Sequence, residues 1–154
     1  MTLLDSFLWL GASAPGQFLK ASTFAFAMTE SAHLLALALL GGTLLVTNLA
    51  ALGVVFRATP VVIVAEGAAK AFWGALGVMA ISGVLLVSAG PFKYYSNPLF
   101  PVKLALLAAA LVLQVLLLVV LRRDGAGLGA RALAGASLAL WFATLIAGRW
   151  LGLI

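Results

Sequence analysis

Glu30 and His33 stand three residues apart in the segment MTESAHLLALALLGG, at the start of a long apolar run. On a helix, residues i and i+3 share a face, so the carboxylate and the imidazole would lie together. Imidazole is the commonest protein ligand of metal ions and binds haem iron, and His33 is the only histidine of the chain. The pair predicts a site for a metal ion or haem b, with His33 as ligand and Glu30 as its orienting partner. The alternative is a structural hydrogen bond from His33 to Glu30 or to a tyrosine.

The number of possible ligands restricts the kind of metal site. Di-iron bundles need two Glu-x-x-His pairs and further glutamates, and this chain has one such pair, so a di-iron site within one chain is excluded. The chain has no cysteine, which excludes a thiolate site and a disulfide framework. A haem could be held by His33 alone, by His33 with Met28, or between the His33 residues of two copies.

Two cations near the ends of apolar runs need partners. Lys103 stands at the start of one run, and Arg149 with Trp150 closes another. A charge within a membrane span costs about 2.5–3.5 kcal/mol on insertion scales and is usually paired. Glu30 is the expected partner, either in a structural Glu30–Arg149 pair or in a site where Lys103 and Arg149 balance the charge of haem propionates, a quinone or a carboxylate.

The loop GPFKYYSNPLFPVK carries the remaining polar candidates. Tyr94, Asn97 and Lys103 could supply the polar contacts of a quinone or headgroup pocket. The alternative is an aromatic belt at the membrane interface with lysines that reach toward water. Pro98 and Pro101 are expected to break helices in this loop.

The composition identifies the elements that must position these residues. Of 154 residues, 65% are apolar and 8% are charged, whereas soluble domains are about 25% charged. About 20 apolar residues cross a bilayer as a helix, and the alternating pattern of a barrel is absent. We predict an all-α, polytopic four-helix membrane bundle as a single domain over 1–154. Its expected spans are about 31–56, 71–91, 101–121 and 132–152, after a short interfacial helix within about 2–20.

Basic residues predict the orientation. The loops after the first and third spans hold Arg57, Lys70, Arg122, Arg123 and Arg131. The positive-inside rule then predicts a multi-pass protein of the bacterial inner membrane with both termini in the periplasm. The lipid bilayer is the expected partner, together with a second copy or other membrane subunits and a periplasmic protein. The net charge of +5 lies at helix ends, so nucleic acid is not expected.

No phosphate-binding loop or catalytic triad is present, so we expect no catalytic residues and no enzyme activity of the chain alone. Three functions remain open. The first is the redox-cofactor or metal site described above. The second is a cofactor-free structural or assembly subunit, in which a small-residue stripe packs against partners: Gly135, Ala139, Ala143 and Ala147. The third is a small oligomeric channel or carrier lined by Asn48 and Gln114.

Four motifs together carry a family resemblance: ESAH, NLAALG, YYSNPLFPVKLALL and SLALWFATLIAGRWLG. From about residue 22 onward the chain resembles a family of small bacterial inner-membrane proteins of unknown function with four helices. The resemblance points to these residues: Glu30, His33, Asn97, Phe100, Lys103, Trp141, Gly148, Arg149 and Trp150. The chain departs from the pattern at Asn48–Leu49–Ala50, where an Asp-Leu-Arg triplet is expected, so the resemblance implies no charge-dependent role there.

Overall fold

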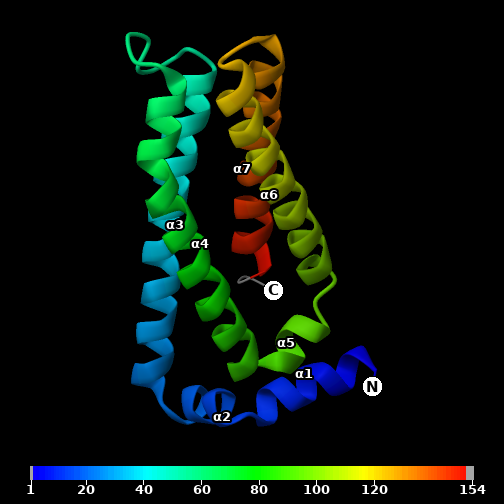
Figure 1. The fold of residues 1–154 in the computed structure, drawn as a ribbon. Helices are drawn as coiled ribbons and strands as arrows, with labels where there is room; N and C mark the ends of the chain where they lie inside the picture. The colour runs from blue at the N-terminus through cyan, green and yellow to red at the C-terminus, as the bar shows by residue number, and fades with distance from the viewer. Residues whose placement is uncertain (1, 152–154) are drawn as a thin grey trace. The chain divides into compact units, whose positions relative to one another are not determined.

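The computed structural model describes residues 2–151, with side chains through residue 150, and these residues are all-helical (Figure 1). This confirms the predicted fold class. The helices are α1 (Leu3–Ala12), α2 (Ala14–Ala21), α3 (Thr23–Ala51), α4 (Val61–Ala89), α5 (Pro91–Tyr95), α6 (Leu99–Asp124) and α7 (Leu128–Leu151).

Four helices, α3, α4, α6 and α7, are long and apolar enough to cross a membrane. Each covers most of the apolar run predicted for it, but α3 and α4 begin eight and ten residues earlier than the expected spans. The added turns carry Glu30, Glu66 and Lys70, whose polar ends can reach water from the terminal turns of a helix. Helix α3 ends at Ala51, before residue 56, where the first span was expected to end. Gly53 and Phe56 adopt positive φ angles, which an α-helix does not accommodate.

The N-terminal segment forms two short helices in place of the single interfacial helix expected there. Thr2 and Asp5 form a capping box at the start of α1, and the Thr2 hydrogen bonds hold the pKa of Asp5 below its usual value. Ser13 ends α1 and accepts a hydrogen bond from Gly16 N–H at the start of α2. Pro15 lies in the first turn of α2, where its missing N–H costs nothing.

The proline-rich segment after α4 is more helical than the sequence suggested. Residues Pro91–Tyr95 form α5, and α6 begins at Leu99 directly after Pro98. Pro101 therefore lies within the first turn of α6 and does not break it, because the first N–H groups of a helix have no partner within the helix.

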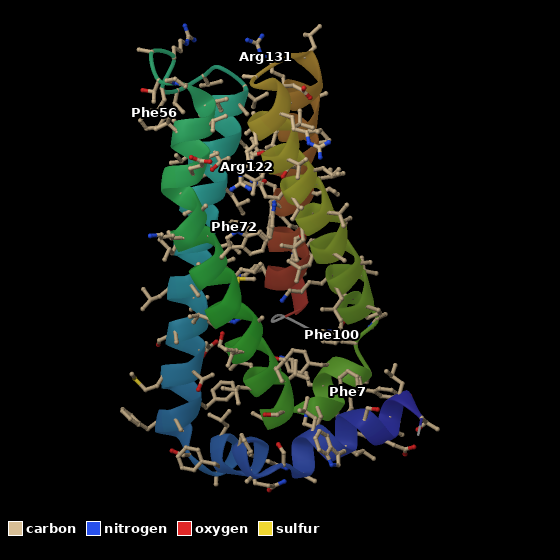
Figure 2. The ribbon with its side chains drawn as sticks, viewed as in Figure 1. Phe7, Phe56, Phe72, Phe100, Arg122 and Arg131 are labelled. Carbon is tan, nitrogen blue, oxygen red and sulfur yellow. The ribbon has the colours of Figure 1, made fainter. Side chains whose placement is uncertain are left out.

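The described chain falls into two compact units: unit 1 comprises Met1–Leu40 and Trp73–Pro98, and unit 2 comprises Gly41–Phe72 and Leu99–Ile154. Helices α3 and α4 contribute residues to both. In unit 1, α1 packs against α5 through the rings of Phe7 and Tyr95, whose centroids lie 5.7 Å apart (Figure 2). The α2 helix approaches α4 so closely that a Cβ on Gly16 would lie 3.0 Å from the Ser88 carbonyl oxygen.

Unit 2 is built on the pair α6 and α7, which lie side by side (Figure 1). Its apolar core brings together four helices and consists mainly of small residues and leucines: Ala51, Ala65, Leu117, Leu121, Ala130 and Ala134. Large apolar side chains such as Leu116, Phe142 and Ile146 are instead exposed. Small side chains inside and large apolar ones outside are typical of helices that pack in lipid.

The small-residue stripe of α7 is not the face that packs within the chain. Gly135 and Ala139 are exposed, whereas the buried face of α7 carries Ser137, Trp141 and Thr144.

Candidate functional site

His33 lies on α3 in unit 1, half-buried, and pairs with a serine of α4. Its Nδ1 atom is 2.8 Å from Ser82 Oγ. The Ser82 hydroxyl also lies 2.6 Å from the Val78 carbonyl oxygen, one turn earlier on α4. A chain of two hydrogen bonds therefore joins the imidazole to the backbone of the neighbouring helix.

This chain of bonds determines which imidazole nitrogen carries the proton. A carbonyl oxygen only accepts, so the short contact to Val78 requires the Ser82 proton. Ser82 Oγ then accepts from His33 Nδ1–H. In the neutral ring, Nε2 consequently carries the lone pair. Ser82 therefore holds the ring through Nδ1, and Glu30 as an orienting partner of His33 stays a prediction.

Gly83 follows Ser82 on α4 and faces the ring. A Cβ on Gly83 would lie 3.5 Å from His33 Cε1 and 4.0 Å from Nδ1, which is ordinary van der Waals contact, so an alanine would also fit beside the imidazole. Ser82, which supplies the hydrogen-bond acceptor, is therefore the residue of α4 that holds the ring. A serine beside a glycine within an uncharged run is the sequence signal that could have identified this position.

The other predicted site residues of unit 1 are Glu30, Tyr94 and Asn97. Glu30 is exposed on α3, Tyr94 is half-buried on α5, and Asn97 is buried just before α6. Burial raises the pKa of the Tyr94 phenol, and the negative charge of Glu30 raises it further. Glu30 and Tyr94 are therefore electrostatically coupled at one end of unit 1.

Lys103, Arg149 and Trp150 belong to unit 2. The Lys103 side chain lies across α7 at Gly148, since a Cβ there would be 3.3 Å from Lys103 Cε and 3.5 Å from Nζ. The lysine motif at the start of α6 and the Gly-Arg-Trp motif of α7 thus meet in space. Arg149 and Trp150 are exposed beside this contact. Pairing of Glu30 with Arg149 or Lys103 stays a prediction.

An apolar groove of about 360 Å³ lies next to the His33–Ser82 pair in unit 1. Its walls include Met28 and Ala32 of α3 and Ser82 and Leu85 of α4. His33 is not among the wall residues, and the groove meets the hydrogen-bond chain of the imidazole at Ser82 and Val78. Within the part of the chain that the structure describes, no three acidic or histidine side chains cluster as metal ligands, so a metal at His33 would need ligands from elsewhere.

The chain matches the family of unknown function DUF6644 over residues 6–154. The chain belongs to this family. The predicted membership of a family of unknown function is thereby confirmed. No curated protein and no solved structure matches the chain.

Unit 2 of this DUF6644 protein contains a buried polar network that the sequence revealed only in part. Gln114 Oε1 of α6 accepts two hydrogen bonds, from Asn48 Nδ2 of α3 at 3.0 Å and from Ser137 Oγ of α7 at 2.8 Å. Asn48 Nδ2 also donates to the Leu44 carbonyl oxygen at 2.8 Å. One amide oxygen therefore connects three helices. Asn48 and Gln114 stood out in the sequence as polar residues, whereas Ser137 did not.

The network contains an acceptor without a donor. Among the described residues, Asn48 Oδ1 is buried and accepts no hydrogen bond, and the buried Trp141 Nε1 donates none. Both residues lie in unit 2 on the buried faces of α3 and α7. Buried water commonly satisfies such groups.

Proposed function

We propose that this member of DUF6644 is an integral membrane protein that binds a metal ion or haem iron through His33 Nε2. The observation that carries the proposal is the Val78–Ser82–His33 chain of hydrogen bonds. Histidine ligands typically donate their other ring N–H to a fixed acceptor, which sets the tautomer and makes the ligating nitrogen more basic. Ser82 supplies that acceptor here.

The choice among the candidate cofactors follows from the same tautomer. A quinone carbonyl needs a hydrogen-bond donor, and the neutral ring has already committed its N–H to Ser82. A metal centre instead needs the lone pair of Nε2. Haem iron or a metal ion is therefore favoured over a quinone at this residue. A bound iron would supply one-electron chemistry.

Completing the coordination requires ligands beyond His33, because the chain has one histidine and no cysteine. A second copy that contributes its own His33 is the simplest source, and the site then requires a homo-oligomer. Exposed Glu30, three residues before His33, could add a carboxylate ligand.

The test is an absorption spectrum with metal analysis on the full chain purified in detergent, in four variants. Wild type should carry a Soret band or stoichiometric metal, and His33→Ala should lose it. Ser82→Ala should weaken metal or haem affinity about 10- to 100-fold, the usual effect of removing a partner that orients a ligand. Ser88→Ala is the matched control, because Ser88 is also buried on α4 and bonds the Leu85 carbonyl but lies away from His33.

A second candidate function is a cofactor-free structural subunit of a membrane complex. The Gln114 network favours it, because bonds from one amide to two neighbouring helices fix helix register without any ligand. Colourless, metal-free wild-type protein, with His33→Ala lowering only thermal stability, would reject the cofactor proposal and leave this one. A channel or carrier role would additionally require flux in liposomes that depends on Gln114 and Asn48.

We further propose that the protein resides in the bacterial inner membrane with both termini in the periplasm. The support is the arginines at one end of the candidate spans. Arg57 lies between α3 and α4, Arg122 and Arg123 lie in the last turn of α6, and Arg131 lies in the first turn of α7.

A further inference from the structure

A cavity of about 590 Å³ lies at the loop end of unit 2, and its walls carry two arginines. It is formed by the segment between α3 and α4, the first turn of α4, and the segment between α6 and α7. Arg57 and Arg131 line it, and none of the described residues in its walls is acidic. We call it the arginine cavity. Figure 2 shows Arg131 and Phe56 at this end of unit 2.

The two guanidinium groups converge on one residue, Gly53. Arg57 Nε donates to the Gly53 carbonyl oxygen at 2.8 Å. Arg131 Nη2 lies 3.7 Å from the position that a Cβ on Gly53 would occupy. The bond from Arg57 uses its Nε–H, and Arg57 is an exposed residue of the cavity wall. Within residues 2–150, neither arginine forms an ion pair with a carboxylate.

The nearest acidic residues do not pair with Arg57 or Arg131. Glu66 is 3.9 Å from Arg122, a pair that lies along α4 and α6 and not in the cavity wall. Asp124 precedes Gly125 at the end of α6, is exposed, and does not line the cavity. Two arginines that share a cavity without a carboxylate repel each other, and a bound anion relieves that repulsion.

The backbone contributes further donors. Helices α4 and α7 both begin at this end of unit 2, at Val61 and Leu128. Val61 and Val62 lie in the cavity wall, and the first N–H groups of a helix have no carbonyl partner within it. Unpaired N–H groups and the positive end of the helix dipole add to the attraction that the guanidinium groups exert on an anion.

We propose that the arginine cavity binds a phosphate group. Guanidinium groups bind phosphate oxygens through paired, charge-assisted hydrogen bonds, which a lone lysine cannot imitate. The phosphate can belong to an anionic phospholipid headgroup or to free phosphate. The cavity lies where candidate membrane spans end, and Val54 and Phe56 beside it are exposed apolar residues. Basic pockets at the cytoplasmic ends of membrane helices commonly hold such headgroups.

The experiment measures binding of defined probes to the full chain in a non-ionic detergent. The lipid probes are dioleoyl phosphatidylglycerol and, as the zwitterionic comparison, dioleoyl phosphatidylcholine, followed by native mass spectrometry. The soluble probe is inorganic phosphate against chloride at equal ionic strength, followed by thermal unfolding. The variants are Arg57→Gln, Arg131→Gln and Arg57→Lys, and Arg123→Gln is the control, because Arg123 is an exposed arginine at the same end that does not line the cavity.

Phosphatidylglycerol should bind more tightly than phosphatidylcholine, and each Gln variant should weaken it about tenfold or more, as expected for loss of hydrogen bonds to a charged group. Arg57→Lys retains the charge and should weaken binding less than Arg57→Gln. Arg123→Gln should bind as wild type. Stabilisation by inorganic phosphate alone, with the same variant pattern, would assign the site to free phosphate. Equal losses in Arg123→Gln and Arg57→Gln, or no loss in either cavity variant, would overturn the proposal.

Discussion

Two of the hydrogen bonds of Ser82 together define the chemistry of His33. The Ser82 hydroxyl donates to the Val78 carbonyl oxygen and accepts from His33 Nδ1–H. Because the carbonyl takes the hydroxyl proton, the proton of the neutral ring lies on Nδ1. Alanine at this position would remove both contacts while keeping the helix. A single hydroxyl in an uncharged run thus controls whether the only histidine presents a donor or a lone pair at Nε2.

Tyr94 offers a direct test of electrostatics in unit 1. Tyr95→Phe leaves Tyr94 as the only tyrosine, so the phenol absorbance reports Tyr94 alone. Its midpoint should lie above the usual 10.0 because burial and then Glu30 oppose ionisation. Glu30→Gln should lower the midpoint without restoring 10.0, since burial is the larger cause. A midpoint unchanged by Glu30→Gln would show that the carboxylate is distant from the phenol.

The same shift has a consequence for stability with a definite sign. The folded-state pKa of Tyr94 is raised, so the folded protein holds the phenol proton more tightly than the unfolded chain. The stabilisation is fully present below pH 10 and is lost as the pH rises through the raised pKa. Unfolding in the Tyr95→Phe background should therefore become easier above pH 10, and less steeply so in Tyr94→Phe.

Helices in this protein approach one another through glycines, and the neighbouring atoms decide what each glycine tolerates. A Cβ on Gly16 would meet two backbone oxygens at 3.0 Å, Leu10 O and Ser88 O. A Cβ on Gly148 would meet the flexible end of Lys103 at 3.3 Å. Backbone atoms cannot move aside as a lysine stem can.

Alanine substitutions at these two glycines should therefore differ. Gly16→Ala should cost about 1–3 kcal/mol of packing, which exceeds the gain of up to about 1 kcal/mol in helix propensity. Gly148→Ala should stay within about 0.5 kcal/mol of wild type. Hydrogen exchange across Ala14–Ala21 is the readout for α2, and thermal unfolding for the whole chain. If the two substitutions had equal effects, the neighbours of Gly16 would not be more rigid than the neighbour of Gly148, and the prediction would be wrong.

The hydrogen bonds of Gln114, which join three helices, lead to a second prediction about packing. Gln114→Leu keeps the volume but removes two interhelical hydrogen bonds, which average about 0.6 kcal/mol each between membrane helices. We expect a loss of about 1–2 kcal/mol in unfolding by denaturing detergent. Val112→Leu, on the exposed face of α6, is the control and should change little. Adding Asn48→Ala should cost less in the Gln114→Leu background than in wild type, and full additivity would argue against the shared bond.

At the scale of the molecule, the residues that the structure describes contain four candidate spans joined by three connections. The segments after α3 and after α6 should therefore lie on one side of the membrane, and the segment after α4 on the other. The basic segments are expected on the cytoplasmic side. This arrangement would place the arginine cavity on the cytoplasmic side and Tyr94 on the periplasmic side.

Cysteine labelling can test this topology, because the chain has no cysteine of its own. Single cysteines at Ala58, Ser96 and Ala126 would occupy exposed positions in the three connections. A membrane-impermeant maleimide should label Ser96→Cys in intact spheroplasts, and Ala58→Cys and Ala126→Cys only after permeabilisation. Labelling of Ala58→Cys and Ala126→Cys from opposite sides would reject the four-span arrangement.

The sequence alone determined the helical class, the apolar spans and the membership of a family of unknown function. Uncharged runs of about 20 residues leave the backbone no other way to satisfy its hydrogen bonds in lipid. The ends of the helices were predicted less well. Glu30 and Glu66 lie inside α3 and α4 although they bound the apolar runs, and Pro101 lies inside α6, because terminal turns tolerate both charge and proline.

Only the tertiary structure decided which polar residues meet. Ser82 is 49 positions from His33, and Ser137 is 23 positions from Gln114, so no local spacing relates them. Their pairing depends on the register between helices, which composition does not encode. The convergence of Arg57 and Arg131 on Gly53 also depends on the tertiary structure. Two segments far apart in the sequence must come together before these arginines can line one cavity.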